Sequence, residues 1–140
     1  VKDAQEMATY RFLLGSQSSL IAKLERPSAL KEAMEIARSV DALWLCRGDL
    51  GAETGLQAMA GLVAQFNTGV AALTKPVHIA GQVLEHTTHY PQPTRSEVCH
   101  LYDMLRNGYQ GIVLSDETAV GRYPVESCRS AAMFREPAAV

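Results

Sequence analysis

The sequence lacks the features that would place the protein in a membrane, in the secretory route or on nucleic acid. No apolar run approaches the roughly 20 residues that cross a bilayer. The opening segment VKDAQEMATYRF is too polar for a signal peptide. The formal net charge is only −2, and the sequence contains no stripe of basic residues that would bind nucleic acid. We therefore expect neither a membrane nor a nucleic acid as a partner.

Cysteines are few, and their spacing suggests no pairing. The chain has three cysteines, Cys46, Cys99 and Cys128, which is an odd number, and none of them forms a CxxC pair. This pattern favours reduced thiols in a cytoplasmic protein over a disulfide framework or a zinc site.

The composition is that of a globular domain, and its apolar runs alternate with helical patterns. The chain has 140 residues, of which 47% are hydrophobic and 20% charged. The predicted strands are 20–22, 42–46, 77–80 and 111–114, and the predicted helices are 3–14, 27–37, 56–66, 98–105 and 124–132. One helix followed by four βα units predicts an α/β fold with a parallel sheet. Both a doubly wound sheet and half of a TIM (βα)8 barrel fit this order.

Polar residues follow each predicted strand. They are Lys23 and Glu25, then Arg47, Gly48 and Asp49, then Gly81 and Gln82, then Ser115 to Thr118. Parallel α/β folds gather the carboxyl ends of their strands at one rim, where active sites lie. Lys23 and Glu25 are two residues apart, so both point the same way on an extended strand. With Asp49, they could bind an anion and Mg²⁺ side by side.

Less specific interpretations exist for the same residues. Lys23 and Glu25 could pair with each other or with Arg47, and charges at strand ends are often only solvated. The tripeptide Arg47 to Asp49 also matches an adhesion ligand, but such ligands lie on exposed loops and this one follows a buried strand.

Several longer motifs resemble the second half of the pyruvate kinase barrel. They are IAKLE, ALWLCRGDLGAE, KPVHIAGQVLEH, PQPTRSE and GIVLSDETAVGRYPVES, and together they run from about Ser19 to Ala132. PTRSE and LSDETAVGRYP are the most specific, because the first two motifs also resemble class II pyruvate aldolases. The resemblance implies strands five to eight of a (βα)8 barrel and the conversion of phosphoenolpyruvate and ADP to pyruvate and ATP in glycolysis.

The resemblance also implies roles for individual residues. Lys23 matches the catalytic lysine that stabilises the transferring phosphoryl group and the enolate. Glu25 and Asp49 match the two Mg²⁺ ligands, and the backbone N–H groups near Gly48 and Asp49 match the holder of the substrate carboxylate. Arg47, Gly81 and Ser115, at the ends of the same strands, complete the predicted substrate-binding set.

Two residues depart from the family pattern. Gly81 stands where the family has a threonine near the face on which the enolate is protonated, and Asp116 replaces the usual glycine. These departures leave two alternatives open. One is a metal-dependent 2-oxo acid aldolase or decarboxylase of the same superfamily, and the other is a catalytically degenerate kinase relative.

The family has parts that residues 1–140 do not match. They are the N-terminal half-barrel, the lid domain, the C-terminal domain, much of the nucleotide site and the K⁺ site. We therefore expect residues 1–140 to be a partial barrel domain that is inactive alone. Its expected partners are the remaining half-barrel of the parent chain or another subunit, within a cytoplasmic homo-oligomer.

Overall fold

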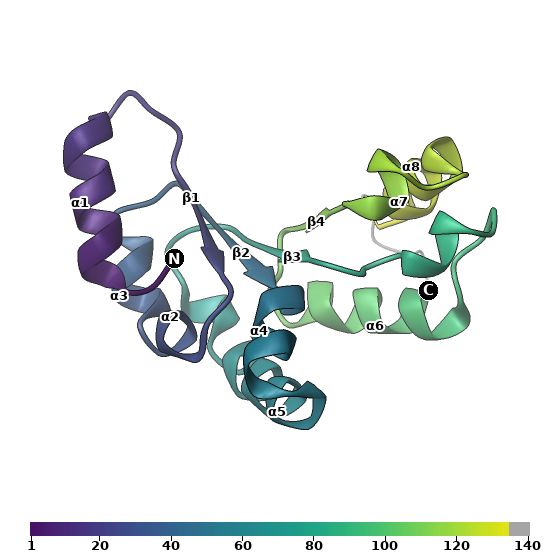
Figure 1. Cartoon of the computed structure of the whole chain (residues 1–140), viewed down its shortest axis with the longest axis horizontal. Helices are drawn as coiled ribbons and strands as arrows, with labels where there is room; N and C mark the ends of the chain where they lie inside the picture. The colour runs from purple at the N-terminus through teal and green to yellow at the C-terminus, as the bar shows by residue number, and fades with distance from the viewer. Residues whose placement is uncertain (135–140) are drawn as a thin grey trace.

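The computed structural model describes residues 1–134, which form one α/β unit (Figure 1). The four strands are parallel and lie in the order β1-β2-β3-β4. They are β1 (Ile21–Leu24), β2 (Ala42–Cys46), β3 (Val77–Ala80) and β4 (Gly111–Val113). The α-helices are α1 (Ala4–Leu14), α2 (Pro27–Lys31), α3 (Ala33–Ala37), α4 (Arg47–Thr54), α5 (Leu56–Asn67), α6 (Arg95–Arg106), α7 (Asp116–Ala119) and α8 (Pro124–Ala132), and two short 3₁₀ helices are η1 (Val70–Ala72) and η2 (Glu85–Thr88).

The order of the strands decides between the two architectures that the sequence allowed. A doubly wound sheet reverses its strand order at a switch point, where its ligands bind. The order observed here runs without a reversal, as it does around a barrel. The predicted parallel α/β fold is therefore confirmed for residues 1–134, and the doubly wound alternative is wrong.

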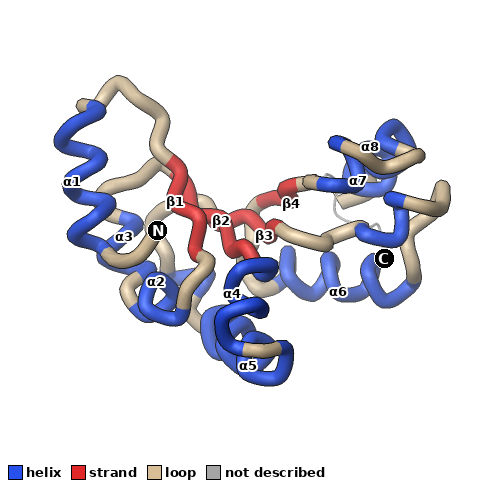
Figure 2. The backbone as a smooth tube through the Cα atoms, viewed as in Figure 1, coloured by secondary structure: helices blue, strands red, loops and turns tan. Residues whose placement is uncertain are grey.

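One face of the sheet is covered by helices, and the other is partly exposed. Leu24, Leu43, Leu45 and Ile79 point to one face and are fully buried, in a core shared with Val63 of α5 and Leu101 and Met104 of α6. Figure 2 shows α5 and α6 along this side of the strands. The opposite face carries Ile21, Lys23, Trp44 and His78, all of them half-buried or exposed, and we refer to it as the open face. Lys23, Trp44 and His78 occupy matching register positions on β1, β2 and β3.

Most predicted elements are present, with shifted ends. The strands at 42–46 and 77–80 match β2 and β3. The first strand begins one residue later than predicted and extends to Leu24, which places Lys23 inside it. The single helix predicted over 27–37 is two helices, α2 and α3, that break at Glu32.

Helix α4 was not predicted, because RGDLGAET contains two glycines, which are poor helix formers. The helix forms because Leu50 is fully buried in the core, so tertiary packing offsets the weak propensity. Arg47, Gly48 and Asp49 are consequently the first turn of a helix and follow β2 without an intervening loop.

Helix α8 buries a different face from the one its apolar residues suggested. Val125 and Cys128 are exposed, whereas Ser127 and Ser130 are buried. The Ser127 hydroxyl lies 2.7 Å from the Thr87 hydroxyl of η2 and donates to the Tyr123 carbonyl oxygen at 2.8 Å. Hydrogen bonding between these hydroxyls satisfies the buried polar groups at this contact.

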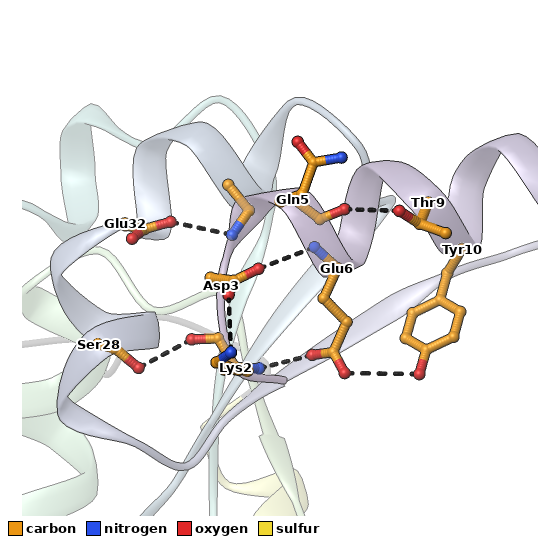
Figure 3. Close-up of polar contacts among 9 residues, drawn as sticks. Lys2, Asp3, Gln5, Glu6, Thr9, Tyr10, Ser28 and Glu32 are labelled. Carbon is orange, nitrogen blue, oxygen red and sulfur yellow. Dashed lines mark hydrogen bonds and ion pairs between the residues drawn. The ribbon is translucent and has the colours of Figure 1, made fainter.

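Side-chain caps fix the N-termini of α1 and α6. At the start of α1, Asp3 accepts from the backbone N–H of Glu6 at 2.8 Å, and Glu32 accepts from that of Ala4 at 3.0 Å (Figure 3). The PTRSE motif supplies a capping box for α6, in which Thr94 and Glu97 bond each other's backbone N–H groups. Within residues 1–134, no helix combines the length and the apolar character that crossing a membrane requires.

Candidate active site

Lys23 and Glu25 form an ion pair at the carboxyl end of β1. Their Nζ and Oε1 atoms are 2.6 Å apart, and the Lys23 side chain is 54% exposed while that of Glu25 is 19% exposed. The pKa of Lys23 is raised, first by the hydrogen bond that its ammonium donates to Glu25, against an opposing effect of burial, and then by the charges of Glu25, Cys46 and Asp49. Lys23 therefore keeps its positive charge at neutral pH.

Asp49 lies on the first turn of α4, beside the end of β1. Gly48 and Asp49 are exposed, and the N–H groups of a first helical turn have no acceptor within their own helix. Such a turn attracts anions, because the N–H groups and the helix dipole both present positive charge. The first turn of α4, whose Asp49 charge reaches Lys23, is therefore suited to a carboxylate or phosphate.

Cys46 is buried within reach of the charges of Glu25 and Asp49, and its thiol stays protonated at neutral pH. The thiol is buried, and its pKa is raised to about 11, mainly by burial and then by the charge of Glu25. Asp49 raises this pKa as well. The adjacent Arg47 therefore does not activate Cys46.

Glu25 and Asp49 suit Mg²⁺ in their chemistry. Both carboxylates act on Lys23 and on Cys46, so their charges converge on the same strand ends. Residues 1–134 contain no group of three His, Cys, Asp or Glu side chains placed to hold a metal. This donor set suits Mg²⁺, which usually binds one or two carboxylates and takes its other ligands from water and substrate.

Arg47 lies away from the Lys23–Glu25 pair. Its Nη2 donates to the carbonyl oxygens of Gly81 at 2.6 Å and Gln82 at 3.0 Å, and its Nη1 donates to His100 Nε2 at 2.9 Å. The guanidinium therefore links the start of α4 to the end of β3 and to α6. A direct contact between Arg47 and substrate stays a prediction.

Gly81 adopts a left-handed backbone conformation, with φ of 78°, and Gln82 follows with φ of 52°. A Cβ atom at Gly81 would lie 3.5 Å from the Arg47 backbone nitrogen and 3.7 Å from that of Gly48. Space for a small side chain therefore exists, and it is the backbone conformation that disfavours a β-branched residue such as threonine. The glycine thus suits a backbone conformation that would strain a threonine, in addition to removing a hydroxyl.

Ser115 lies at the far edge of the sheet from Lys23. Two strands, β2 and β3, separate β1 from β4, and Figure 1 shows α7 and α8 beyond the end of β4. Asp116 is exposed at the start of α7, and the pKa of Glu85 is raised mainly by burial, then by the charges of Glu117 and Asp116. Residues 1–134 thus bring Lys23, Glu25 and Asp49 together and leave Ser115 apart.

Glu117 and His100 were missed by sequence reasoning. Glu117 is fully buried, and its two carboxylate oxygens accept from the backbone N–H groups of Leu84 at 3.0 Å and Ser115 at 2.7 Å. In the sequence, Glu117 is one of several polar residues in a row, and nothing marks it as buried. His100 is 53 positions from Arg47 and had no motif to mark it.

These features define a class before any comparison with other proteins. The chain is a parallel α/β protein of the barrel type, with a lysine, two carboxylates and a helix start gathered at the carboxyl ends of its strands. The sequence model of one family, described as "Pyruvate kinase, barrel domain", matches residues 1–128. The chain therefore belongs to the pyruvate kinase barrel-domain family.

Curated relatives agree with this assignment. The chain is 37% identical over 127 residues to a pyruvate kinase of Agrobacterium vitis. This alignment covers 91% of this chain and 26% of that protein. It is 36% identical over 118 residues to a pyruvate kinase of Buchnera aphidicola, covering 82% and 25%. For the chloroplastic pyruvate kinase isozyme A of Ricinus communis the identity is 38% over 109 residues, covering 78% and 19%. The chain spans about a quarter or less of the length of these relatives.

Proposed function

We propose that residues 1–140 supply the catalytic rim of a pyruvate kinase, which transfers a phosphoryl group from phosphoenolpyruvate to ADP. The observation that carries this proposal is the Lys23–Glu25 pair beside the Asp49-bearing start of α4. A permanently charged lysine, two carboxylates and free N–H groups suit phosphoryl transfer, which depends mainly on positioning and charge neutralisation.

In the proposed reaction each group has a defined task. The bond between phosphorus and the enol oxygen breaks, a new bond forms to a terminal oxygen of ADP, and the electron pair stays on the enolate, which then takes a proton at carbon. Lys23 stabilises the negative charge on the phosphoryl and enolate oxygens. The N–H groups of Gly48 and Asp49 hold the substrate carboxylate. Glu25 and Asp49 would hold Mg²⁺, which supplies further positive charge to the same oxygens.

The state of the pair before substrate binds fits this scheme. The Lys23 ammonium contacts Glu25, so the lysine must exchange part of this contact to reach a phosphoryl group, and Glu25 would then be available to hold Mg²⁺. Because Lys23 is more than half exposed, its head group can move without opening the core.

We also propose that residues 1–140 form half of a (βα)8 barrel within a larger assembly. Two observations support this: within residues 1–134, β1 and β4 each have one strand neighbour, and the open face carries Ile21 at 40% exposure together with the half-buried Trp44. Strand edges and apolar sheet faces are normally covered. The cover would be the other half-barrel of the same chain or of a second subunit in a cytoplasmic homo-oligomer, and that half would bring the K⁺ site and much of the ATP site.

The test of the kinase proposal uses oxalate, a mimic of enolpyruvate, and Mg²⁺. We expect calorimetry to show oxalate binding that requires Mg²⁺, that is lost in Asp49→Asn and that is weakened at least tenfold in Lys23→Met. Glu53→Gln, an exposed carboxylate further along α4, is the matched control. Turnover of phosphoenolpyruvate by the complete assembly should fall in Lys23→Met, and an unchanged rate would refute the role of Lys23.

Gly81 keeps a second reaction open. A site without the threonine side chain has more room beside the enolate, and this favours an aldolase or decarboxylase acting on a 2-oxo acid. Metal-dependent cleavage of a 4-hydroxy-2-oxo acid, without phosphoryl transfer, would favour this alternative. A third possibility is a degenerate relative that binds without catalysis, and the absence of oxalate binding together with the absence of turnover would favour it.

A further inference from the structure

The Arg47 guanidinium ends against an imidazole on another helix. Nη1 lies 2.9 Å from His100 Nε2, and Nη2 donates to the carbonyl oxygens of Gly81 and Gln82. Within residues 1–134, none of the ion pairs includes Arg47. The described part of the chain therefore holds this half-buried cation with two carbonyls and one imidazole.

This contact fixes the protonation state of His100. A guanidinium can only donate hydrogen bonds, so Nε2 must accept, and the proton of a neutral imidazole must sit on Nδ1. An imidazolium has no free acceptor and would place a second positive charge against Arg47. Burial lowers the pKa of His100, the charge of Arg47 lowers it further, and Asp103 on the same helix opposes them.

We propose that His100 is a positioning residue for the candidate active site. His100 holds Arg47 in place only while the imidazole of His100 is neutral. The charged groups that act on it are Arg47 of α4 and Asp103 of α6, and the end of β3 presents to Arg47 the carbonyls of Gly81 and Gln82. Protonation of His100 removes the acceptor for Nη1 and repels the guanidinium.

The consequence reaches the site because Arg47 is the first residue of α4. Gly48 and Asp49 follow it directly, and the position of a Gly81 Cβ lies 3.5 Å from the Arg47 nitrogen. We expect a shift of Arg47 to reach the N–H groups that the proposed function assigns to the substrate carboxylate. Loss of one charge-assisted hydrogen bond predicts anion binding weaker by about tenfold.

The first test needs no ligand. In ¹⁵N NMR of the whole chain, we expect His100 Nε2 to be unprotonated at neutral pH and to titrate below the usual pH of about 6.5. The backbone amides of Gly48 and Gln82 should shift with the same midpoint. In His100→Gln, whose amide oxygen still accepts but does not titrate, these amides should stay constant. His89→Gln, an exposed histidine of the neighbouring segment, should leave the titration unchanged.

Three results of this first test would overturn the proposal. They are a protonated Nε2 at neutral pH, amides of Gly48 and Gln82 that ignore the titration, and amides that titrate equally in His100→Gln. Because the wild-type titration alone can give the first two, the proposal can be refuted even if a variant fails to fold.

The second test uses oxalate with Mg²⁺ and rests on the proposed function. Between about pH 7.5 and a pH below the His100 midpoint found in the first test, wild-type affinity should fall by about tenfold, while His100→Gln should keep its affinity. Equal affinity at both pH values, or an equal loss in His100→Gln, would refute the positioning role. If oxalate does not bind at any pH while the amides still follow His100, the proposed function fails and the link from His100 to Arg47 stands.

Discussion

Glu117 bonds the backbone N–H of Leu84 at 3.0 Å from a position 33 residues further along the chain. Its other carboxylate oxygen accepts from Ser115 at 2.7 Å. The fully buried side chain thus holds the segments that follow β3 and β4 against each other. Together with the bonds from Arg47 to the Gly81 and Gln82 carbonyl oxygens, this residue holds the chain beyond Gly81.

Glu117→Gln should destabilise the fold by about 1–3 kcal/mol, because one carboxylate oxygen is replaced by an NH₂ group that cannot accept from a backbone N–H. Urea unfolding followed by circular dichroism would measure this as a lower midpoint. Glu53→Gln is the control, since Glu53 is exposed and the substitution should change stability by less than about 0.5 kcal/mol. Equal midpoints for the two variants would contradict the role of Glu117.

Alanine at two glycines should have opposite effects. Gly81→Ala should destabilise the protein by about 1–2 kcal/mol, because φ of 78° is unfavourable for a residue with a Cβ. Gly61→Ala should stabilise it by about 0.5–1 kcal/mol, because Gly61 lies inside α5 and a Cβ there has no heavy atom within 4 Å. Both are read from the same unfolding curves, and a stabilising Gly81→Ala would show that the backbone there is unstrained.

The three thiols should differ sharply in reactivity. At about pH 8, a thiol with a pKa of about 11 has far less thiolate than an ordinary cysteine, so Cys46 should be alkylated roughly a hundredfold more slowly than the exposed Cys99 and Cys128. Peptide mass spectrometry after iodoacetamide treatment would give the three rates. Unfolded protein is the control, where all three should react alike. Rapid labelling of Cys46 in the folded state would contradict its burial.

Asp41 should make stability depend on pH in the acid range. Its pKa is lowered by hydrogen bonds from the Leu20 N–H and the Arg11 side chain, at 2.8 and 2.6 Å. A carboxyl with a lowered folded-state pKa stabilises the fold above its unfolded value of about 3.9, and this contribution is lost as pH falls through the folded value. Asp41→Asn should therefore lower the unfolding midpoint at pH 7. A difference that persists well below pH 3.9 would exclude this linkage.

Local patterns predicted part of this molecule well. The strands at 42–46 and 77–80 are apolar runs with sharp ends, and the pairing of Lys23 with Glu25 follows from the two-residue period of an extended strand. Helix α4 escaped prediction because its stability comes from burying Leu50, which its own propensity does not reveal.

Contacts between distant segments could not be predicted in the same way. The direction of Arg47 depends on where α6 places His100, and the burial of Glu117 depends on the segment at Leu84. The sequence spacing of these residues carries no local signal, since each contact exists only after the sheet has formed.

Trp44 gives the protein an intrinsic optical reporter. It is the one tryptophan of the sequence, and it lies on the open face between the register positions of Lys23 and His78. An indole emits at shorter wavelength when water leaves its surroundings, so covering this face should shift the fluorescence to the blue. Mixing the chain with a complementary half-barrel would show directly, in a cuvette and without a label, whether the two halves join.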